Sequence, residues 1–146
     1  MAVQVRLFRK EDLDRVLEIS VRYASFDSVA RESDLKKAAR FPRGFWVAEN
    51  DAKVIGFVYG GMKAVPEAVL ERWGAKRVGY VGLMAVVPEW RRRGVGKALL
   101  DRLLEEFRRQ GVDMVLLDCP AEATQAAKLY TAAGFETRFR GMKKRL

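Results

Sequence analysis

A short basic stretch that contains two glycines is the part of the chain best suited to binding a ligand. Residues 91–97 follow an apolar run, Val81 to Val87, that stops at Pro88, and they precede an amphipathic helix pattern. Where a strand leads through a short loop into a helix, the first N–H groups of the helix are unpaired and the helix dipole adds partial positive charge. The candidate residues of this anion site are Arg91, Arg92, Arg93, Gly94, Val95, Gly96 and Lys97.

The spacing of the glycines limits which kind of phosphate-binding motif this loop can be. A Walker loop needs four residues between its first Gly and a Gly-Lys-Ser/Thr, and Lys97 is followed by Ala98. A dinucleotide fingerprint needs a third Gly and an acidic ribose ligand, which the chain lacks here. A pyrophosphate site on a central strand remains, with a tight packing turn as the alternative.

The residue types also limit the chemistry. The chain has no His and one cysteine, Cys119, so an internal disulfide and a thiolate metal cluster are excluded, and we expect no metal site. A base must be a carboxylate, Tyr, Lys or water. Cys119 as a nucleophile would lack a His partner, so a half-buried thiol at a strand end is the favoured interpretation.

The length of the chain indicates a single domain, and its charge indicates attraction to anions. We expect residues 1–146 to form one domain with one core. No signal-peptide pattern or membrane-length apolar run occurs, so a cytoplasmic protein without membrane contact is expected. The net charge of +9 would attract nucleic acid, a phosphorylated ligand or an acidic partner, and it is also compatible with a solvated surface.

Apolar periodicity predicts an alternation of strands and helices along the whole chain. Helices are expected at 11–25, 31–40, 67–73, 96–110 and 122–133. Strands are expected at 3–7, 45–49, 54–60, 77–87 and 114–117, followed by two short closing strands, Phe135 to Phe139 and Gly141 to Arg145. The strands at 45–49 and 54–60 read as a hairpin, and a right-handed crossover helix joins the strands at 77–87 and 114–117.

Two spaced motifs resemble a known family. Arg91-x-x-Gly94-x-Gly96 looks like the acyl-CoA-binding motif of the GNAT superfamily of N-acetyltransferases. Residues 126–135, reading AAKLYTAAGF, are similar to the later A-x-x-L-Y-x-x-x-G-F helix of that family. The resemblance covers nearly the whole chain. It implies an α/β (α+β) three-layer fold with a central mixed, mostly antiparallel, splayed sheet of about six to seven strands and about four flanking helices.

The resemblance also implies how an acyl donor is held. The main chain of Met84, Ala85 and Val86 would pair with the pantetheine amides of acetyl-CoA, and residues 92–97 would hold the pyrophosphate. The donor acts as a cosubstrate that passes its acetyl group to an amine without a covalent enzyme intermediate. An N–H group within Met84 to Val86 is a candidate donor to the tetrahedral oxyanion.

Two side chains are candidates for proton transfer. Tyr130 matches the family position that often supplies the acid, with a packed structural Tyr as the alternative. Asp118 matches a position where the branch resembling ribosomal-protein N-terminal acetyltransferases has Glu, and a strand-end polar residue is the alternative. Glu49 and water are further candidates for the base. Ala123 departs from the family, which frequently has Asn there.

The sequence therefore predicts an N-acetyltransferase (acyltransferase) that uses acetyl-CoA and a primary amine. The amine could be a protein N-terminus, a lysine or a small molecule, and a homodimer is open. A non-catalytic acyl-CoA sensor is the alternative. A third hypothesis, a nucleic-acid-binding domain, rests on the positive charge alone. The sequence has no nucleic-acid recognition motif, so no specific nucleic acid is expected as a partner. Trp73 and Tyr80 could line a substrate wall, although core packing is the commoner role of such aromatics.

Overall fold

A single mixed sheet forms the middle of the molecule. The computed structural model describes residues 2–146. The sheet has the order β1-β2-β3-β4-β5, in which β1 to β4 are antiparallel and β5 runs parallel to β4. The strands are β1 (Gln4–Leu7), β2 (Phe45–Asn50), β3 (Lys53–Met62), β4 (Val78–Val86) and β5 (Met114–Leu117).

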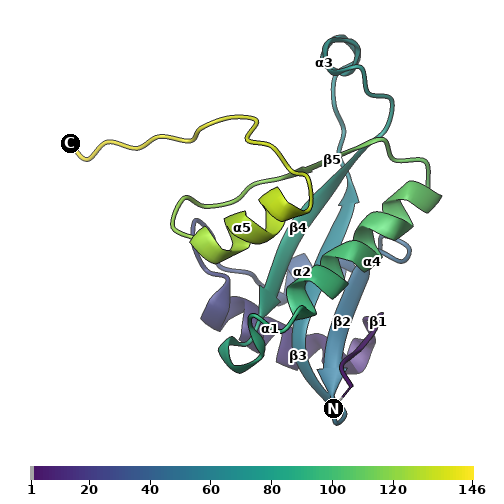
Figure 1. Cartoon of the computed structure of the whole chain (residues 1–146), viewed down its shortest axis with the longest axis vertical. Helices are drawn as coiled ribbons and strands as arrows, with labels where there is room; N and C mark the ends of the chain where they lie inside the picture. The colour runs from purple at the N-terminus through teal and green to yellow at the C-terminus, as the bar shows by residue number, and fades with distance from the viewer. Residues whose placement is uncertain (1) are drawn as a thin grey trace.

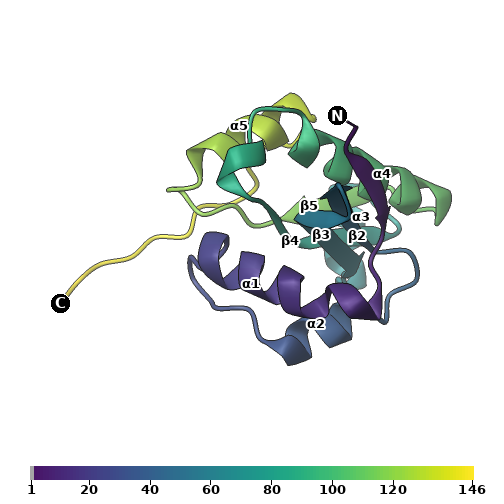
Figure 2. The same cartoon turned by 90° about the horizontal axis from the view of Figure 1, so that it is seen from below.

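Helices cover both faces of this sheet. Figure 2 shows α1 (Leu13–Tyr23) and α2 (Glu32–Ala38) on one face, and α4 (Val95–Arg109) and α5 (Thr124–Ala132) on the other. The connection between β3 and β4 carries α3 (Glu67–Trp73), which projects beyond the end of the sheet in Figure 1. Two short 3-10 turns, η1 (Lys10–Asp12) and η2 (Pro88–Trp90), precede α1 and the loop before α4. The expected three-layer architecture is confirmed.

The core lies where α1 and α4 press their apolar stripes on the sheet. Leu99, Leu103 and Phe107 of α4 are buried, as their helical spacing predicts. Two strand glycines let α4 come close: a Cβ at Gly79 would lie 3.0 Å from the Phe107 ring, and a Cβ at Gly60 would lie 2.5 Å from the carbonyl oxygen of Tyr80. These positions therefore tolerate no side chain without movement of the backbone or of α4.

The two expected closing strands are absent, so the prediction for residues 135–139 and 141–145 is wrong. No strand follows β5 in the described part of the chain, and Figures 1 and 2 show the last residues running away from the sheet. Phe135 packs against the core, but Met142 is 93% exposed and the segment around it is strongly basic. Too few apolar side chains are available there to cover a sheet face. The sheet consequently has five strands instead of six to seven, with five α-helices instead of about four.

Candidate functional site

The sheet opens between β4 and β5. The two strands pair only from Val78 opposite Met114 to Val81 opposite Leu117. Beyond this point β4 continues to Val86 while still paired with β3. The register between β3 and β4 also shifts at Gly82, which leaves this residue as a bulge next to the point of divergence. Residues 82–86 thus have one edge that β5 does not cover.

Alternate residues of this edge present their polar main-chain groups to the opening. The N–H of Val87 donates to the carbonyl of Ile55 on β3 at 2.9 Å. Polar groups of successive residues point to opposite sides of an antiparallel strand. Ala85 therefore faces β3, as Val87 does, while Met84 and Val86 face the opening. Of the three residues expected to pair with a ligand, the structure brings two into position and turns the polar groups of Ala85 away.

The loop expected to bind an anion lies directly after this edge. Gly94 caps α4 with a left-handed φ of 80°, and no side chain caps the first N–H groups of the helix. Arg92 also has a positive φ, of 61°, which is strained for a residue with a side chain. An uncapped helix start beside basic side chains is the arrangement that binds phosphate groups.

The basic residues of this loop differ in their contacts. The Arg91 Nε donates to the carbonyl oxygen of Val86 at 2.9 Å, so this side chain fastens the loop to the end of β4. Arg93 lies 4.9 Å over the ring of Trp90, and Lys97 pairs with Asp101 at 2.6 Å one turn further along α4. These contacts position Arg91 as a support of the loop.

Gly96 brings the helix start close to the opening. A Cβ at this position would lie 3.2 Å from Cδ2 of Leu129 on α5 and 3.8 Å from Cε of Met84 on β4. The first turn of α4, side chains of β4 and one face of α5 therefore meet at Gly96. The two motifs, at residues 91–96 and 126–135, therefore lie side by side.

Tyr130 lies on α5 beside Cys119. Its ring is mostly buried and meets the ring of Phe135 edge-on, with 5.9 Å between centroids. Burial raises the pKa of Tyr130 to about 12, with a smaller contribution from Cys119. The phenol is consequently protonated near neutral pH and can act as a proton donor. Burial also raises the pKa of the Cys119 thiol, which disfavours a nucleophilic thiolate.

Asp118 follows the last residue of β5 that pairs with β4. The Tyr80 hydroxyl donates to its Oδ2 at 3.3 Å, and the Arg138 Nη2 lies 3.5 Å from its Oδ1. Burial raises the pKa of the Tyr80 phenol, and the nearby carboxylate adds to this shift. The sequence pattern predicts neither contact. The contact with Tyr80 depends on the parallel register, which sets Tyr80 level with Leu116, and Arg138 lies in a segment without strand pairing.

Glu49, the further sequence candidate for the base, lies outside this group. The Glu49 carboxylate accepts from Arg6 Nε at 3.0 Å, and its strand β2 is separated from β4 by β3. The structure therefore does not bring Glu49 to the opening. Ala123 is the residue before α5 and provides no side-chain cap for it.

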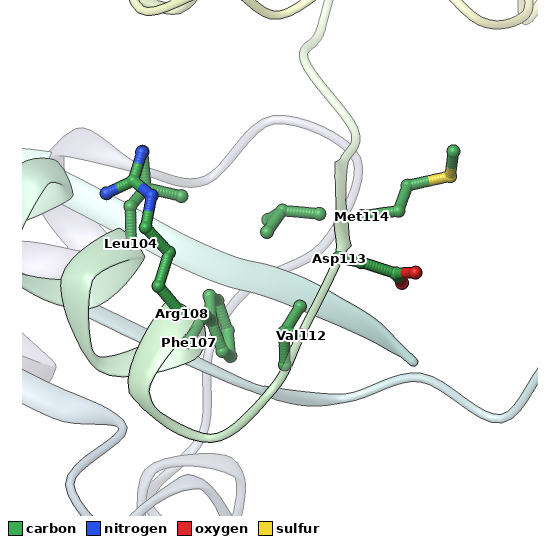
Figure 3. Close-up of a pocket in the computed structure, with 7 residues that line it drawn as sticks. Leu104, Phe107, Arg108, Val112, Asp113 and Met114 are labelled. Carbon is green, nitrogen blue, oxygen red and sulfur yellow. The ribbon is translucent and has the colours of Figure 1, made fainter. Parts of the chain in front are cut away.

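Two hollows in the surface lie away from the opening. One has a volume of about 180 Å³ and lies between the last turns of α4 and β5, where Leu104, Phe107 and Val112 contribute to its lining (Figure 3). The other lies between η1, α1 and α2, next to Leu13 and Lys36.

In the described part of the chain, no helix has the length and apolar character of a membrane span.

Comparison with known proteins finds solved structures with a similar fold. No curated protein sequence matches the chain significantly. Among solved structures, Ard1 from Thermoplasma volcanium is 25% identical, with a TM-score of 0.79 over 95% of this chain and 86% of that one. The ribosomal-protein-S18-alanine N-acetyltransferase from Escherichia coli is 22% identical, with a TM-score of 0.73 over 94% and 80%. The aminoglycoside N-acetyltransferase AAC(6')-Iy, solved with CoA, is 22% identical, with a TM-score of 0.75 over 99% and 95%.

The family itself is identified by the sequence. The model of the acetyltransferase (GNAT) family matches residues 12–135, which include β2 to β5, the basic loop and α5. Both resemblances noted in the sequence, at residues 91–96 and 126–135, fall within this match. The chain belongs to the GNAT family of acetyltransferases.

Proposed function

We propose that the protein transfers an acetyl group from acetyl-CoA to a primary amine by direct attack. The observation that carries this proposal is the junction at Gly96, where an uncapped helix start, a strand edge with outward polar groups and the Tyr130 helix lie together. Family membership supports the same acyl donor.

The donor side is assigned to the opening and the basic loop. Met84 and Val86 would pair their outward N–H and C=O groups with the two amides of the pantetheine arm, as an added strand does. The pyrophosphate would bind the first N–H groups of α4, with Arg92 and Arg93 adding charge-assisted hydrogen bonds. Arg91 would act mainly through the loop, since it is bonded to Val86.

Removal of the proton from the acceptor amine is assigned to Asp118. A primary ammonium has a pKa of roughly 10, so a group must remove a proton before or during attack at neutral pH. Asp118 lies at the point where β4 and β5 diverge, and it is about half exposed. Its carboxylate would accept the proton of the ammonium, directly or through a water molecule.

The remaining steps would use Met84, Val86 and Tyr130. The amine nitrogen attacks the thioester carbon, and an outward N–H of β4 donates to the resulting oxyanion. The C–S bond then breaks, and the Tyr130 hydroxyl donates its proton to the departing thiolate. The raised pKa of Tyr130 keeps this proton in place until the thiolate forms.

The proposal is tested by binding and turnover together. A ligand at about 100 times its dissociation constant stabilises a one-site protein by roughly 2.7 kcal/mol, so acetyl-CoA should raise the melting temperature clearly. Release of free thiol should then depend on an added amine from a panel of peptides, polyamines and aminoglycosides. No thermal shift with millimolar acetyl-CoA contradicts the proposal. A shift without turnover on any amine would favour the acyl-CoA sensor instead.

A further inference from the structure

A second group of side chains lies at the same opening but is not used for holding the donor. We call Trp73, Tyr80 and Asp118 the cation site. The Tyr80 hydroxyl is bonded to Asp118, and the guanidinium of Arg138 lies against both Asp118, at 3.5 Å, and the ring of Trp73, at 5.9 Å. Arg138 also lies 4.6 Å over the ring of Phe139. A cation of the protein thus occupies this group of residues.

The cation site lies on the face of the sheet opposite to α4. Gly79 faces Phe107 of α4, so the next residue, Tyr80, points to the other face. There Tyr80 packs with Trp73 in a small apolar cluster around Val78. The basic loop and α4 approach the opening from one face, and the cation site approaches it from the other. Two reactants could therefore meet at the point where β4 and β5 diverge.

The three side chains of the cation site have the chemistry of a receptor for organic cations. A carboxylate pairs with an ammonium or guanidinium, and the faces of indole and phenol rings attract the same groups through their quadrupoles. Lys63 lies 5.4 Å from the Tyr80 ring centroid, so a second cation already uses that ring. The carboxylate of Asp118 and the face of Trp73 are the parts that an incoming ligand would contact.

The contact with Arg138 is weak enough to be exchanged. Its side chain is 40% exposed and that of Asp118 is 55% exposed, and ion pairs with this exposure contribute little to stability. Arg138 belongs to the C-terminal segment, which has no strand or helix to fix it in the described part of the chain. Displacement of its guanidinium by another cation would therefore disturb little else.

We infer that Asp118 and the face of Trp73 bind the ammonium or guanidinium group of a ligand, with the Tyr80 hydroxyl holding the Asp118 carboxylate, and that Arg138 is the resident occupant that this ligand displaces. The role of this site in holding the acceptor rests on the proposed function, whereas cation binding itself does not. The C-terminal segment then regulates access, because an acceptor must displace Arg138 before it reaches Asp118. Acceptors with an exposed positive charge are the expected class.

Agmatine, which carries one primary amine and one guanidinium, is a suitable probe. The protein is labelled with 5-fluorotryptophan, and the Trp73 resonance is identified by its loss in Trp73→Phe. Agmatine should shift this resonance in the wild-type protein. It should bind about two- to sixfold more tightly to Arg138→Gln, because an internal competitor held by about 0.2–1 kcal/mol is gone; this change corresponds to about 0.5–1.1 kcal/mol. Adding Asp118→Asn to that variant should abolish the shift.

Arg140→Gln is the matched control, since it removes the same charge from the exposed C-terminal segment two residues away. Its affinity for agmatine should equal that of the wild type. Equal affinity in Arg138→Gln and wild type would overturn the inference, as would shifts confined to Trp46 and Trp90, which lie near other arginines. A thermal shift with acetyl-CoA, measured on every variant, reports separately on the proposed function.

Discussion

Replacing Arg92 by glycine should make the protein more stable and its binding of acetyl-CoA weaker. Arg92 has a φ of 61°, a left-handed conformation that costs a residue with a side chain about 1–2 kcal/mol. Glycine removes this cost but loses about 0.5–1 kcal/mol of conformational entropy. At the middle of these ranges the net gain is about 0.75 kcal/mol, which corresponds to a rise of about 1.5–3 °C in melting temperature for a domain of this size.

The same substitution removes a donor from the proposed pyrophosphate site. A hydrogen bond to a charged group contributes about 1.5–3 kcal/mol, and a loss of about 2 kcal/mol weakens binding about 30-fold. At an acetyl-CoA concentration of 100 times the wild-type dissociation constant, the stabilisation falls from about 2.7 to about 0.9 kcal/mol. The ligand-induced rise in melting temperature should then fall from about 8 °C to about 3 °C.

Two variants separate strain from charge, with differential scanning calorimetry as the assay. Arg92→Gln keeps the left-handed side chain but loses the charge, so it should lose affinity without gaining stability. Ala52→Gly relieves a φ of 63° in the turn between β2 and β3, so it should gain stability with an unchanged response to acetyl-CoA. A full wild-type response in Arg92→Gly would refute the assignment of Arg92 to the pyrophosphate.

Three other predictions concern the acid, an ion pair and a close contact. Tyr130→Phe should lower kcat about 10²- to 10⁴-fold with unchanged affinity for acetyl-CoA. In the wild type, kcat should not fall between pH 7 and 10 through deprotonation of Tyr130, because the pKa of this phenol is about 12. Burial tends to raise the pKa of Asp12, but bonds from Arg6 and from the main chain bring it below its usual value. The free energy of unfolding should therefore be constant above about pH 4 and fall as the pH drops through this lowered pKa. Asp12→Asn should flatten this pH dependence and lower the free energy of unfolding by about 2–4 kcal/mol in urea titrations at pH 7. Gly60→Ala should cost about 2–3 kcal/mol by the same titration, since its Cβ would lie 2.5 Å from the carbonyl oxygen of Tyr80; an unchanged midpoint would show that β4 can move.

The sequence was most informative where burial has a regular period. The spacing of Leu99, Leu103 and Phe107 predicts the buried stripe of α4, and the apolar run before Pro88 predicts β4. The basic glycine loop was identified because a helix start after a strand has free N–H groups whatever the rest of the fold. These features depend on local order along the chain.

Features that depend on register could not be derived in this way. Whether an N–H of Met84 or of Ala85 faces the opening depends on pairing with β3 and on the bulge at Gly82, neither of which is visible in a hydrophobic pattern. The two closing strands expected after Gly134 do not form, because that segment has too few apolar residues to cover a sheet face. The contact between Asp118 and Arg138 joins residues from a strand end and an irregular segment, where no period applies.

The short pairing of β5 has a consequence for how the fold opens. Four residues hold β5 to β4, whereas β3 follows β4 along most of its length. The helix after β5 has no fully buried residue, so little apolar surface ties α5 to the rest of the fold. Amide hydrogens of β5 and α5 should therefore exchange with solvent by local opening, faster than those of β2 and β3. A ligand that contacts both β4 and α5 would join the strands β2 to β4 and the segment from β5 to α5 into one cooperative unit. It would slow amide exchange mainly in β5 and α5.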